Sequence, residues 1–537
     1  MGRPFPATLE VTQMRSIHSV IAFAICLLVT CNLSVVTAEV TLPAVVGDHM
    51  VLQHGRPVAI WGWADPGETV SVTIAGQSAS AAVGSDRRWQ VTLPKLNPSA
   101  EPTEMRIQGS SGSRRIVKDI LVGEVWFCTG PSNIFWPVSR CDNAKQEIAA
   151  ADYPKIRFFT VQRKAADTPQ VDCVGDWFTC SPETVGSVSG VGYFFSRKLH
   201  HDLDVPIGML QSFWGGSRIE AWTSIEALKA EPELKPILDW WATSFAQFDP
   251  DKAQAEYGRQ LELWKQAVAK AKAEGQKQPS KPKTPMNPHV SQHRPACLYN
   301  GMVAPLIPYS LSGVISYQGL GNLFWAQYSQ LLLRTMISDW RSRWGQGPFP
   351  FGMVQPAPFP CDNWAKSSPD AYALQRESQL LLLDTVPFTG VAPTIDIGDL
   401  KVLHFTNKQE VGRRMALWAM ATVYGSDVPY SGPIYKSMTI EGNRIRIHFT
   451  HTGTGLTTND GRAPSHFMIA GSDKNFYPAT ATIDGSTVLV FSERVPEPVA
   501  VRFAFSEVDI PNLINREGLP ASLFRTDVPN LPGNPGH

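Results

Sequence analysis

Between residues 119 and 427 the chain alternates short apolar segments with amphipathic ones, and this alternation limits the folds open to it. The apolar segments have the length of buried strands, and turns separate them from segments with helical spacing. Strands that alternate with helices build a mainly parallel sheet covered on both faces. We therefore predict an α/β domain. Its strands are expected at 125–128, 206–212, 313–318, 349–355 and 392–397, and its helices at 191–203, 324–341, 371–383 and 408–423.

A segment at about 225–297 interrupts this pattern. Tyr257, Leu261 and Trp264 recur at helical spacing among charged residues, and a loop rich in proline and lysine follows at 275–288. Charges of both signs alternate on the polar face of this helix, which argues against a membrane-facing role. We predict a helical insertion that packs on the outside of the sheet domain.

Two all-β domains are predicted to flank the sheet domain. Residues 39–118 and 428–537 both alternate apolar and polar residues in short runs that are separated by turns. In the first of these domains, Trp61 and Trp63 would bind sugar if their rings were exposed. Aromatic residues at strand period belong more often to a core, and this remains the alternative.

Residues 1–38 are predicted to be an export signal. Arg3 and Arg15 precede the apolar run IAFAICLLVT, and Val36-Thr37-Ala38 offers the small residues that a signal peptidase reads. A membrane anchor is the alternative, but the run is shorter than the roughly 20 residues that a span needs. We therefore expect a secreted or periplasmic protein without a stable membrane span.

The composition excludes several classes of function. Lys and Arg together number 48, as do Asp and Glu, so the net charge of zero predicts no nucleic-acid partner. No zinc-binding spacing of cysteine and histidine occurs, and we expect no metal and no cofactor. Export would permit disulfides. Cys173 with Cys180, or Cys128 with Cys141, lie near each other in the sequence, which does not determine the pairing.

Unusual turns follow several of the predicted strands. Ligands bind beyond the carboxyl ends of the strands in open parallel sheets, so these turns are expected to line one rim. Ser132 in the first turn is either a nucleophile or a helix N-cap. Together with Gly215, Gly216, Asn322 and His404 it would supply the hydroxyl, the base and the oxyanion donors that acyl transfer needs.

Several motifs occur in order between Leu42 and Asp527, among them DILVGEVWFCTGPSNIFWPV, VGYFFSRKLHHDLDVPIGMLQSFWGGSRIEAW, GVISYQGLGN and TIDIGDLKVLHFTNKQEVGRRMALWA. This series resembles the sialate O-acetylesterase family, a branch of the SGNH hydrolases. The resemblance implies an SGNH-like, flavodoxin-like sheet domain. It also implies a carbohydrate esterase without a cofactor, acting on an acetylated glycan or on acetylated sialic acid.

The resemblance also implies roles for individual residues. Ser132 matches the nucleophile of the family's Gly-Gln-Ser-Asn-Met motif, and His404 matches the general base. Gly215, Gly216 and Asn322 match the donors to the oxyanion. The predicted substrate-binding residues are Asn133, Trp214 and Gln318.

The sequence departs from the family's motifs where the chemistry would occur. Pro131 replaces Gln, Ile134 replaces Met, Phe135 replaces the acidic residue that usually follows, and Leu320-Gly321 replaces Glu-Ser. These changes make the rim more apolar. They would alter the acyl or sugar group that is accepted, or abolish turnover and leave a binding cleft.

The most serious departure concerns the acid of the triad. Val402 stands where the family has the carboxylate two residues before the base, and losing such an acid costs on the order of 10⁴ in turnover in a serine protease. We predict that Asp399 substitutes for it at the ring of His404, with Asp396 as the other option. Both carboxylates could instead only brace the loop.

Two functions follow from these patterns. The first is a secreted carbohydrate O-acetylesterase that works through a serine acyl-enzyme. The alternative is a catalytically impaired pseudo-esterase that binds glycans, and a purely structural secreted protein is a third hypothesis.

Overall fold

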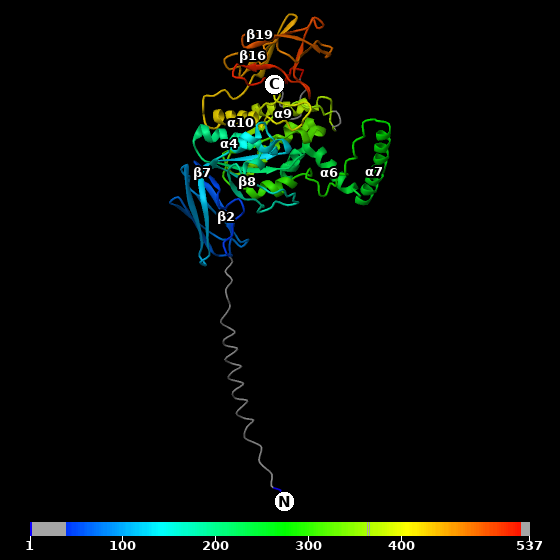
Figure 1. Ribbon diagram of the computed structural model, residues 1–537. Helices are drawn as coiled ribbons and strands as arrows, with labels where there is room; N and C mark the ends of the chain where they lie inside the picture. The colour runs from blue at the N-terminus through cyan, green and yellow to red at the C-terminus, as the bar shows by residue number, and fades with distance from the viewer. Residues whose placement is uncertain (3–38, 362–363, 365, 528–537) are drawn as a thin grey trace.

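The computed structural model describes residues 1–2, 39–361, 364 and 366–527 (Figure 1). The predicted export signal falls almost wholly on residues 3–38, which lie outside the described residues. Among the described residues, none of the helices combines the length and the apolarity that crossing a membrane requires. Figure 1 shows the sheet domain in the middle, with one β domain at each end.

The central sheet has the strand order β13-β12-β11-β7-β10-β8-β9. Its neighbours pair in parallel, except that β9 is antiparallel to β8. An α/β domain with a mostly parallel sheet is therefore confirmed. The strands are β7 (Arg114–Gly130), β8 (Tyr153–Thr160), β9 (Trp177–Cys180), β10 (Ile207–Phe213), β11 (Gly313–Ser316), β12 (Phe351–Val354) and β13 (Thr389–Ala392).

One predicted strand is wrong and two strands were not predicted. The run at 392–397 is mainly the loop after β13, and it is apolar because Ile395 packs into the core of the C-terminal β domain. Contact with another domain therefore gave this loop an apolar sequence like that of a buried strand. β8 was not predicted because Pro154 and Lys155 interrupt its apolar pattern, and β9 was not predicted because it has only 4 residues.

Helices cover both faces of the sheet, and alternate residues of β7 show which face each helix covers. Trp126 and Cys128 share one apolar cluster with residues of α4 and α10, whereas Val125 and Phe127 share the opposite cluster with residues of α8. This alternation is the period of two that a strand imposes. The main helices are α4 (Gly190–Leu203), α8 (Ser329–Trp344), α9 (Ala371–Thr385) and α10 (Lys408–Thr422).

The insertion forms α5 (Ile225–Ala230), α6 (Lys235–Gln247) and α7 (Pro250–Ala273). α6 buries Ile237 and Trp241, whereas α7 buries only Ala271. Figure 1 shows α7 projecting away from the sheet domain. The insertion is therefore attached through α6.

The N-terminal β domain shares a strand with the sheet domain. The first half of β7 pairs with β6 in antiparallel fashion, and the second half pairs with β10 and β11. A continuous strand thus crosses the predicted boundary at residue 118. The other strands are β1 (Val51–Gln53), β2 (Val58–Trp63), β3 (Thr69–Ile74), β4 (Gln77–Ala82), β5 (Arg88–Leu93) and β6 (Ser99–Gly109).

The C-terminal β domain contains two four-stranded sheets and a short two-stranded one. It contacts the sheet domain through Arg525, whose guanidinium donates two hydrogen bonds of 2.9 Å to Glu377 on α9. The strands are β14 (Ile434–Glu441), β15 (Arg444–Thr450), β16 (Leu456–Thr458), β17 (Phe467–Ala470), β18 (Phe476–Pro478), β19 (Thr480–Asp484), β20 (Thr487–Phe491), β21 (Ala500–Phe503), β22 (Leu513–Asn515) and β23 (Phe524–Arg525).

Cys128, Cys141, Cys173 and Cys180 are buried and form no disulfide, so neither suggested pairing occurs. Cys173 packs in the cluster on one face of the sheet and Cys180 in the cluster on the other. The thiol of Cys128 lies 3.9 Å from Oγ of Ser189, and the thiol of Cys141 donates to the carbonyl of Pro137.

Candidate active site

Ser132 follows the carboxyl end of β7 directly. Gly130, with a φ of 136°, allows the close approach there, because a Cβ on it would lie 2.7 Å from the carbonyl oxygen of Tyr317. Ser132 is the first residue of the short helix α2 (Ser132–Phe135), whose N-cap is Pro131, and no side chain caps this helix. The alternative that Ser132 is an N-cap is therefore wrong.

The base predicted from the sequence contacts the predicted nucleophile. Nε2 of His404, in the loop between β13 and α10, lies 2.7 Å from Oγ of Ser132. The ring of His404 stacks on Trp136, with centroids 4.8 Å apart and planes inclined by 9°. Trp136 is itself held, because its indole N–H donates to the carbonyl of Arg140 at 2.9 Å. The structure thus brings together two side chains that are 272 residues apart in the chain.

In the part of the chain that the structure describes, no hydrogen bond or ion pair joins a carboxylate to the ring of His404. Asp399 is exposed, and its carboxylate accepts the backbone N–H of Lys401 at 2.7 Å. Asp396 forms two hydrogen bonds of 2.7 Å with Arg414. The prediction that Asp399 orients the ring is therefore not met, because its carboxylate braces its own turn. The contact that fixes the plane of the ring is the stacking on Trp136.

A buried lysine ties the two halves of the site together. Nζ of Lys408 donates to Oδ1 of Asn133 at 2.8 Å, and the amide nitrogen of Asn133 donates to the carbonyl of Leu403 at 3.2 Å. These bonds join the turn that carries Ser132 to the loop that carries His404. Both ends of the Asn133 amide take part in these bonds, so this residue positions the site, and it also lines the cavity beside Ser132.

The charges around the site favour neutral histidine. Lys408 is fully buried, and its Nζ lies 3.6 Å from the centroid of the Phe405 ring; no carboxylate pairs with it among the described residues. Burial therefore lowers the pKa of Lys408 to about 7. Burial also lowers the pKa of His404, and the positive charges of Lys408 and Arg140 lower it further. At neutral pH the ring is in the form that accepts a proton from a serine.

Free backbone donors lie beside Ser132. A Cβ on Gly215 would be 3.5 Å from Cβ of Ser132, which shows how closely the turn after β10 approaches it. Within the described residues, no backbone acceptor takes the N–H of Gly215 or Gly216. The N–H of Ser132 is also without an intrahelical partner, because it begins a helix. An oxyanion needs donors of this kind.

The side chain of Asn322 is engaged elsewhere. Its oxygen accepts the backbone N–H of Ile219 at 2.9 Å, and its nitrogen donates to the buried carboxylate of Glu220 at 2.7 Å. Gln318 differs, because it is 2% exposed and neither polar atom of its amide has a partner among the described residues. Gln318 lines the cavity beside Ser132, whereas Asn322 does not. Gln318, and not Asn322, therefore has a free side-chain amide that could donate a hydrogen bond to an oxyanion in this cavity.

The cavity at Ser132 has a volume of about 150 Å³. Its walls include Leu320, Leu403, Tyr317 and Trp364, so much of its lining is apolar. Trp214, predicted to bind substrate, packs against the main hydrophobic core and is not part of this lining. Trp364 was not predicted because it lies well inside the long loop between β12 and α9 and not in the turn directly after the strand.

The lysine and the tryptophan at the centre of the site were missed as well. Lys408 lies in a helical pattern, where a lysine is expected to be solvated, and only the packing of α10 shows that it is buried. Trp136 lies within the motif of Ser132, so its nearness to the site was accessible from the sequence. Its stacking on His404 was not.

The fold and the site define an α/β protein with a serine–histidine pair at the carboxyl edge of its sheet. No protein-family model matches the chain. Sialate O-acetylesterase of Mus musculus is 28% identical over 458 residues, which are 76% of this chain and 78% of the relative. The human enzyme of the same name is 28% identical over 444 residues, 76% of this chain and 75% of the relative.

A solved structure agrees with these relatives. The crystal structure of a novel carbohydrate acetylesterase from Xanthomonas citri is 34% identical and has a TM-score of 0.76. The match covers 91% of this chain and 100% of the other. The chain belongs to the sialate O-acetylesterase family.

The substitution Lys408→Met tests the charge of the buried amine. The pKa of Lys408 is lower in the folded protein than in the unfolded chain, so the unfolded chain binds more protons between about pH 7 and about pH 10. Over this window the wild-type protein gains stability as pH rises. We expect the free energy of unfolding of wild type, relative to Lys408→Met, to increase from pH 7 to pH 10 in denaturant titrations.

The substitution Lys270→Met on α7 provides a matched control, because it removes an amine that is exposed and not a buried one. The difference in the free energy of unfolding between wild type and Lys270→Met is expected to stay constant over the same pH range. A constant difference for Lys408→Met as well would contradict the lowered pKa.

Proposed function

We propose that the protein is a carbohydrate O-acetylesterase that removes acetyl groups from sugar hydroxyls through a serine acyl-enzyme. The observation that carries the proposal is the contact of 2.7 Å between Nε2 of His404 and Oγ of Ser132, beside a small cavity with free donors. Relatives named sialate O-acetylesterase and carbohydrate acetylesterase support acetylated sugars as the substrate class.

The topology supports an SGNH-like, flavodoxin-like domain. With β7 as the first strand, the order β10-β7-β11-β12-β13 follows the flavodoxin-like order 2-1-3-4-5, and β8 and β9 extend one edge. The strand order reverses between β7 and β11, which is where such sheets bind ligands. Ser132 follows β7 and Gln318 follows β11, so both lie at this point.

In the proposed mechanism, His404 takes the proton of Ser132 as Oγ attacks the acetyl carbonyl carbon. The oxyanion that forms accepts hydrogen bonds from the backbone N–H groups of Gly215, Gly216 and Ser132 and from the amide of Gln318. His404 then gives its proton to the sugar oxygen, which leaves. A water molecule attacks the acetyl-serine, again with His404 as base, and acetate is released.

The cavity favours a short acyl group. A volume of about 150 Å³ with apolar walls has room for an acetyl group or another short acyl group. Leu320 lines it at a position where the family has Glu. This apolar wall supports acceptance of a methyl group and rejection of charged acyl groups.

A second candidate function is glycan binding without turnover. The observation that favours it is the absence, among the described residues, of a carboxylate at the ring of His404. In the esterase proposal the stacking on Trp136 replaces the carboxylate as the means of holding the ring, although it contributes no negative charge to stabilise the imidazolium. A slow esterase is therefore expected.

We further propose that the protein is exported. The basic residues and the apolar run of the first 38 residues support this. Cys128, Cys141, Cys173 and Cys180 are buried without a disulfide, so they neither need an oxidising compartment nor oppose one.

The substitution Ser132→Ala tests the nucleophile. We expect it to lower the hydrolysis of p-nitrophenyl acetate by at least about 100-fold, because no other hydroxyl among the described residues bonds to His404. A fluorophosphonate should label the wild-type protein and not the variant. Ser139→Ala, an exposed serine of the same segment, is the control and should behave like wild type. Glycan binding without any labelling of wild type would favour the pseudo-esterase instead.

The pH dependence tests the base. Protonated His404 cannot accept the serine proton, so kcat/KM should fall as pH falls through the pKa of His404. Since burial and nearby positive charge lower this pKa, the midpoint is expected below the ordinary value of about 6.5. Arg140→Gln should move the midpoint to higher pH at low ionic strength, and salt should reduce the difference. A midpoint above 6.5 would contradict the charge arrangement.

The substitutions Gln318→Leu and Asn322→Leu distinguish the two candidate oxyanion donors. Gln318→Leu should lower kcat by about 10²–10³ with a small change in KM, because one oxyanion donor is lost. It should not destabilise the fold, since its amide has no partner to lose. Asn322→Leu should instead lower the melting temperature, because it leaves Glu220 buried without its donor. A loss of kcat at unchanged stability in Asn322→Leu alone would identify Asn322 as the donor.

A further inference from the structure

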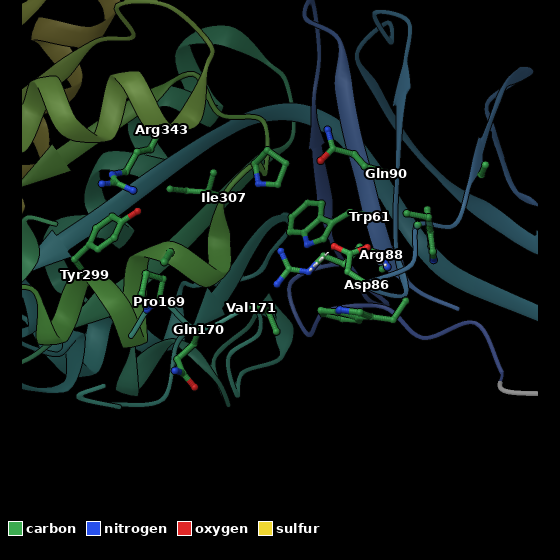
Figure 2. A pocket seen from close by; sticks show the side chains of 17 residues that line it. Trp61, Asp86, Arg88, Gln90, Pro169, Gln170, Val171, Tyr299, Ile307 and Arg343 are labelled. Carbon is green, nitrogen blue, oxygen red and sulfur yellow. Dashed lines mark hydrogen bonds and ion pairs between the residues drawn. The ribbon is translucent and has the colours of Figure 1, made fainter. Parts of the chain in front are cut away.

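A cleft of about 690 Å³ lies between the N-terminal β domain and the sheet domain (Figure 2). Its walls include Ile307 and Pro308, which precede β11, so it lies at the amino ends of the parallel strands. Ser132 lies at the carboxyl ends of the same strands. The cleft is therefore separate from the serine–histidine pair, and the mechanism above does not use it.

One wall of the cleft is a face of the ribbon formed by β2 and β5. Trp61 pairs with Gln90, and Trp63 pairs with Arg88. Directly paired residues lie on the same side of a sheet, as do residues two apart in one strand, so these four side chains share one face. Figure 2 shows Trp61 and Gln90 directed from this ribbon toward the cleft. The two indoles are spaced by roughly 7 Å along the strand.

The indole of Trp61 is held by its neighbours, whereas that of Trp63 is more accessible. Trp61 is 9% exposed, and its ring meets Tyr309 edge to face with centroids 6.4 Å apart. Trp63 keeps more of its surface exposed. Trp89 stands between Arg88 and Gln90 in β5, so its side chain lies on the other face of the ribbon, where it is 2% exposed and packs in the core.

The facing wall comes from the sheet domain. Figure 2 shows Tyr299, Ile307 and Arg343 on this side, together with the loop of Pro169, Gln170 and Val171. Val171 is 46% exposed, so it offers apolar surface to anything held in the cleft. The cleft thus presents aromatic and apolar surface on both sides, with polar groups between.

The charged side chains of the cleft are already paired. Arg88 lies 3.9 Å from Asp86. Arg343 contacts Asp339 at 2.6 Å and Glu226 at 2.8 Å. The lining therefore has no charge left over for an anion or a cation. A neutral ligand fits it better than a sialylated or phosphorylated one.

We propose that this cleft binds a neutral oligosaccharide chain at a second site, apart from the esterase site. The C–H faces of sugar rings pack on indole rings such as those of Trp61 and Trp63, and their hydroxyls bond to amides such as that of Gln90. On a polymeric substrate, a second contact raises the local concentration of acetyl groups at Ser132. The proposal does not depend on turnover.

The test measures binding in the Ser132→Ala background, where no ester is hydrolysed. Xylohexaose and cellohexaose are the probes, and calorimetry gives the Kd. We expect at least one of them to bind, and Trp63→Ala and Gln90→Ala each to weaken its binding by about tenfold or more. Trp264→Ala removes a similarly half-buried tryptophan from α7 and should leave the Kd unchanged.

Val171→Glu provides a second route if Trp63→Ala fails to fold, because residue 171 is exposed and lies on the opposite wall. The added charge should weaken binding of the neutral chain. The proposal is overturned if neither hexaose binds, if the cleft variants bind as the Ser132→Ala parent does, or if Trp264→Ala weakens binding equally. With Ser132 intact, Trp63→Ala should hydrolyse p-nitrophenyl acetate at the wild-type rate, so failure here is distinct from failure of the esterase proposal.

Discussion

The parallel pairing of β7 with β11 is the constraint on which the site depends. Thr129 is in register with Ser316, so the chain leaves both strands at the same level, and Ser132 and Gln318 emerge side by side. The glycine at 130 allows the two backbones to approach closely at this level. A slip of one residue in this register would turn every side chain of β11 to the other face and remove Gln318 from the cavity.

A buried lysine and a stacked tryptophan hold the site where the family uses a carboxylate. Lys408 ties the turn of Ser132 to the loop of His404 through Asn133, and Trp136 fixes the plane of the histidine ring. Neither contact supplies the negative charge that would stabilise a protonated histidine. The arrangement keeps His404 neutral and correctly placed, at the expense of the driving force for proton transfer.

β7 also connects the N-terminal β domain to the central sheet. Its first half belongs to the N-terminal β domain and its second half to the central sheet, so one strand extends from that domain to the turn that carries Ser132. A linker of ordinary flexibility would let the two domains move relative to each other. A continuous strand holds them in one arrangement, and it keeps the cleft lined by both domains.

The sequence by itself determined the α/β class, the flanking β domains and the turns that carry Ser132 and His404, because local hydrophobic periodicity and turn residues express these features directly. Only the tertiary structure decided that Asp399 turns away, that Gln318 and not Asn322 faces the cavity, and that Lys408 is buried. Local patterns cannot contain such facts. The contacts that settle them join residues as far apart as Asn133 and Lys408, which are 275 positions apart and meet only when the loops after different strands pack together.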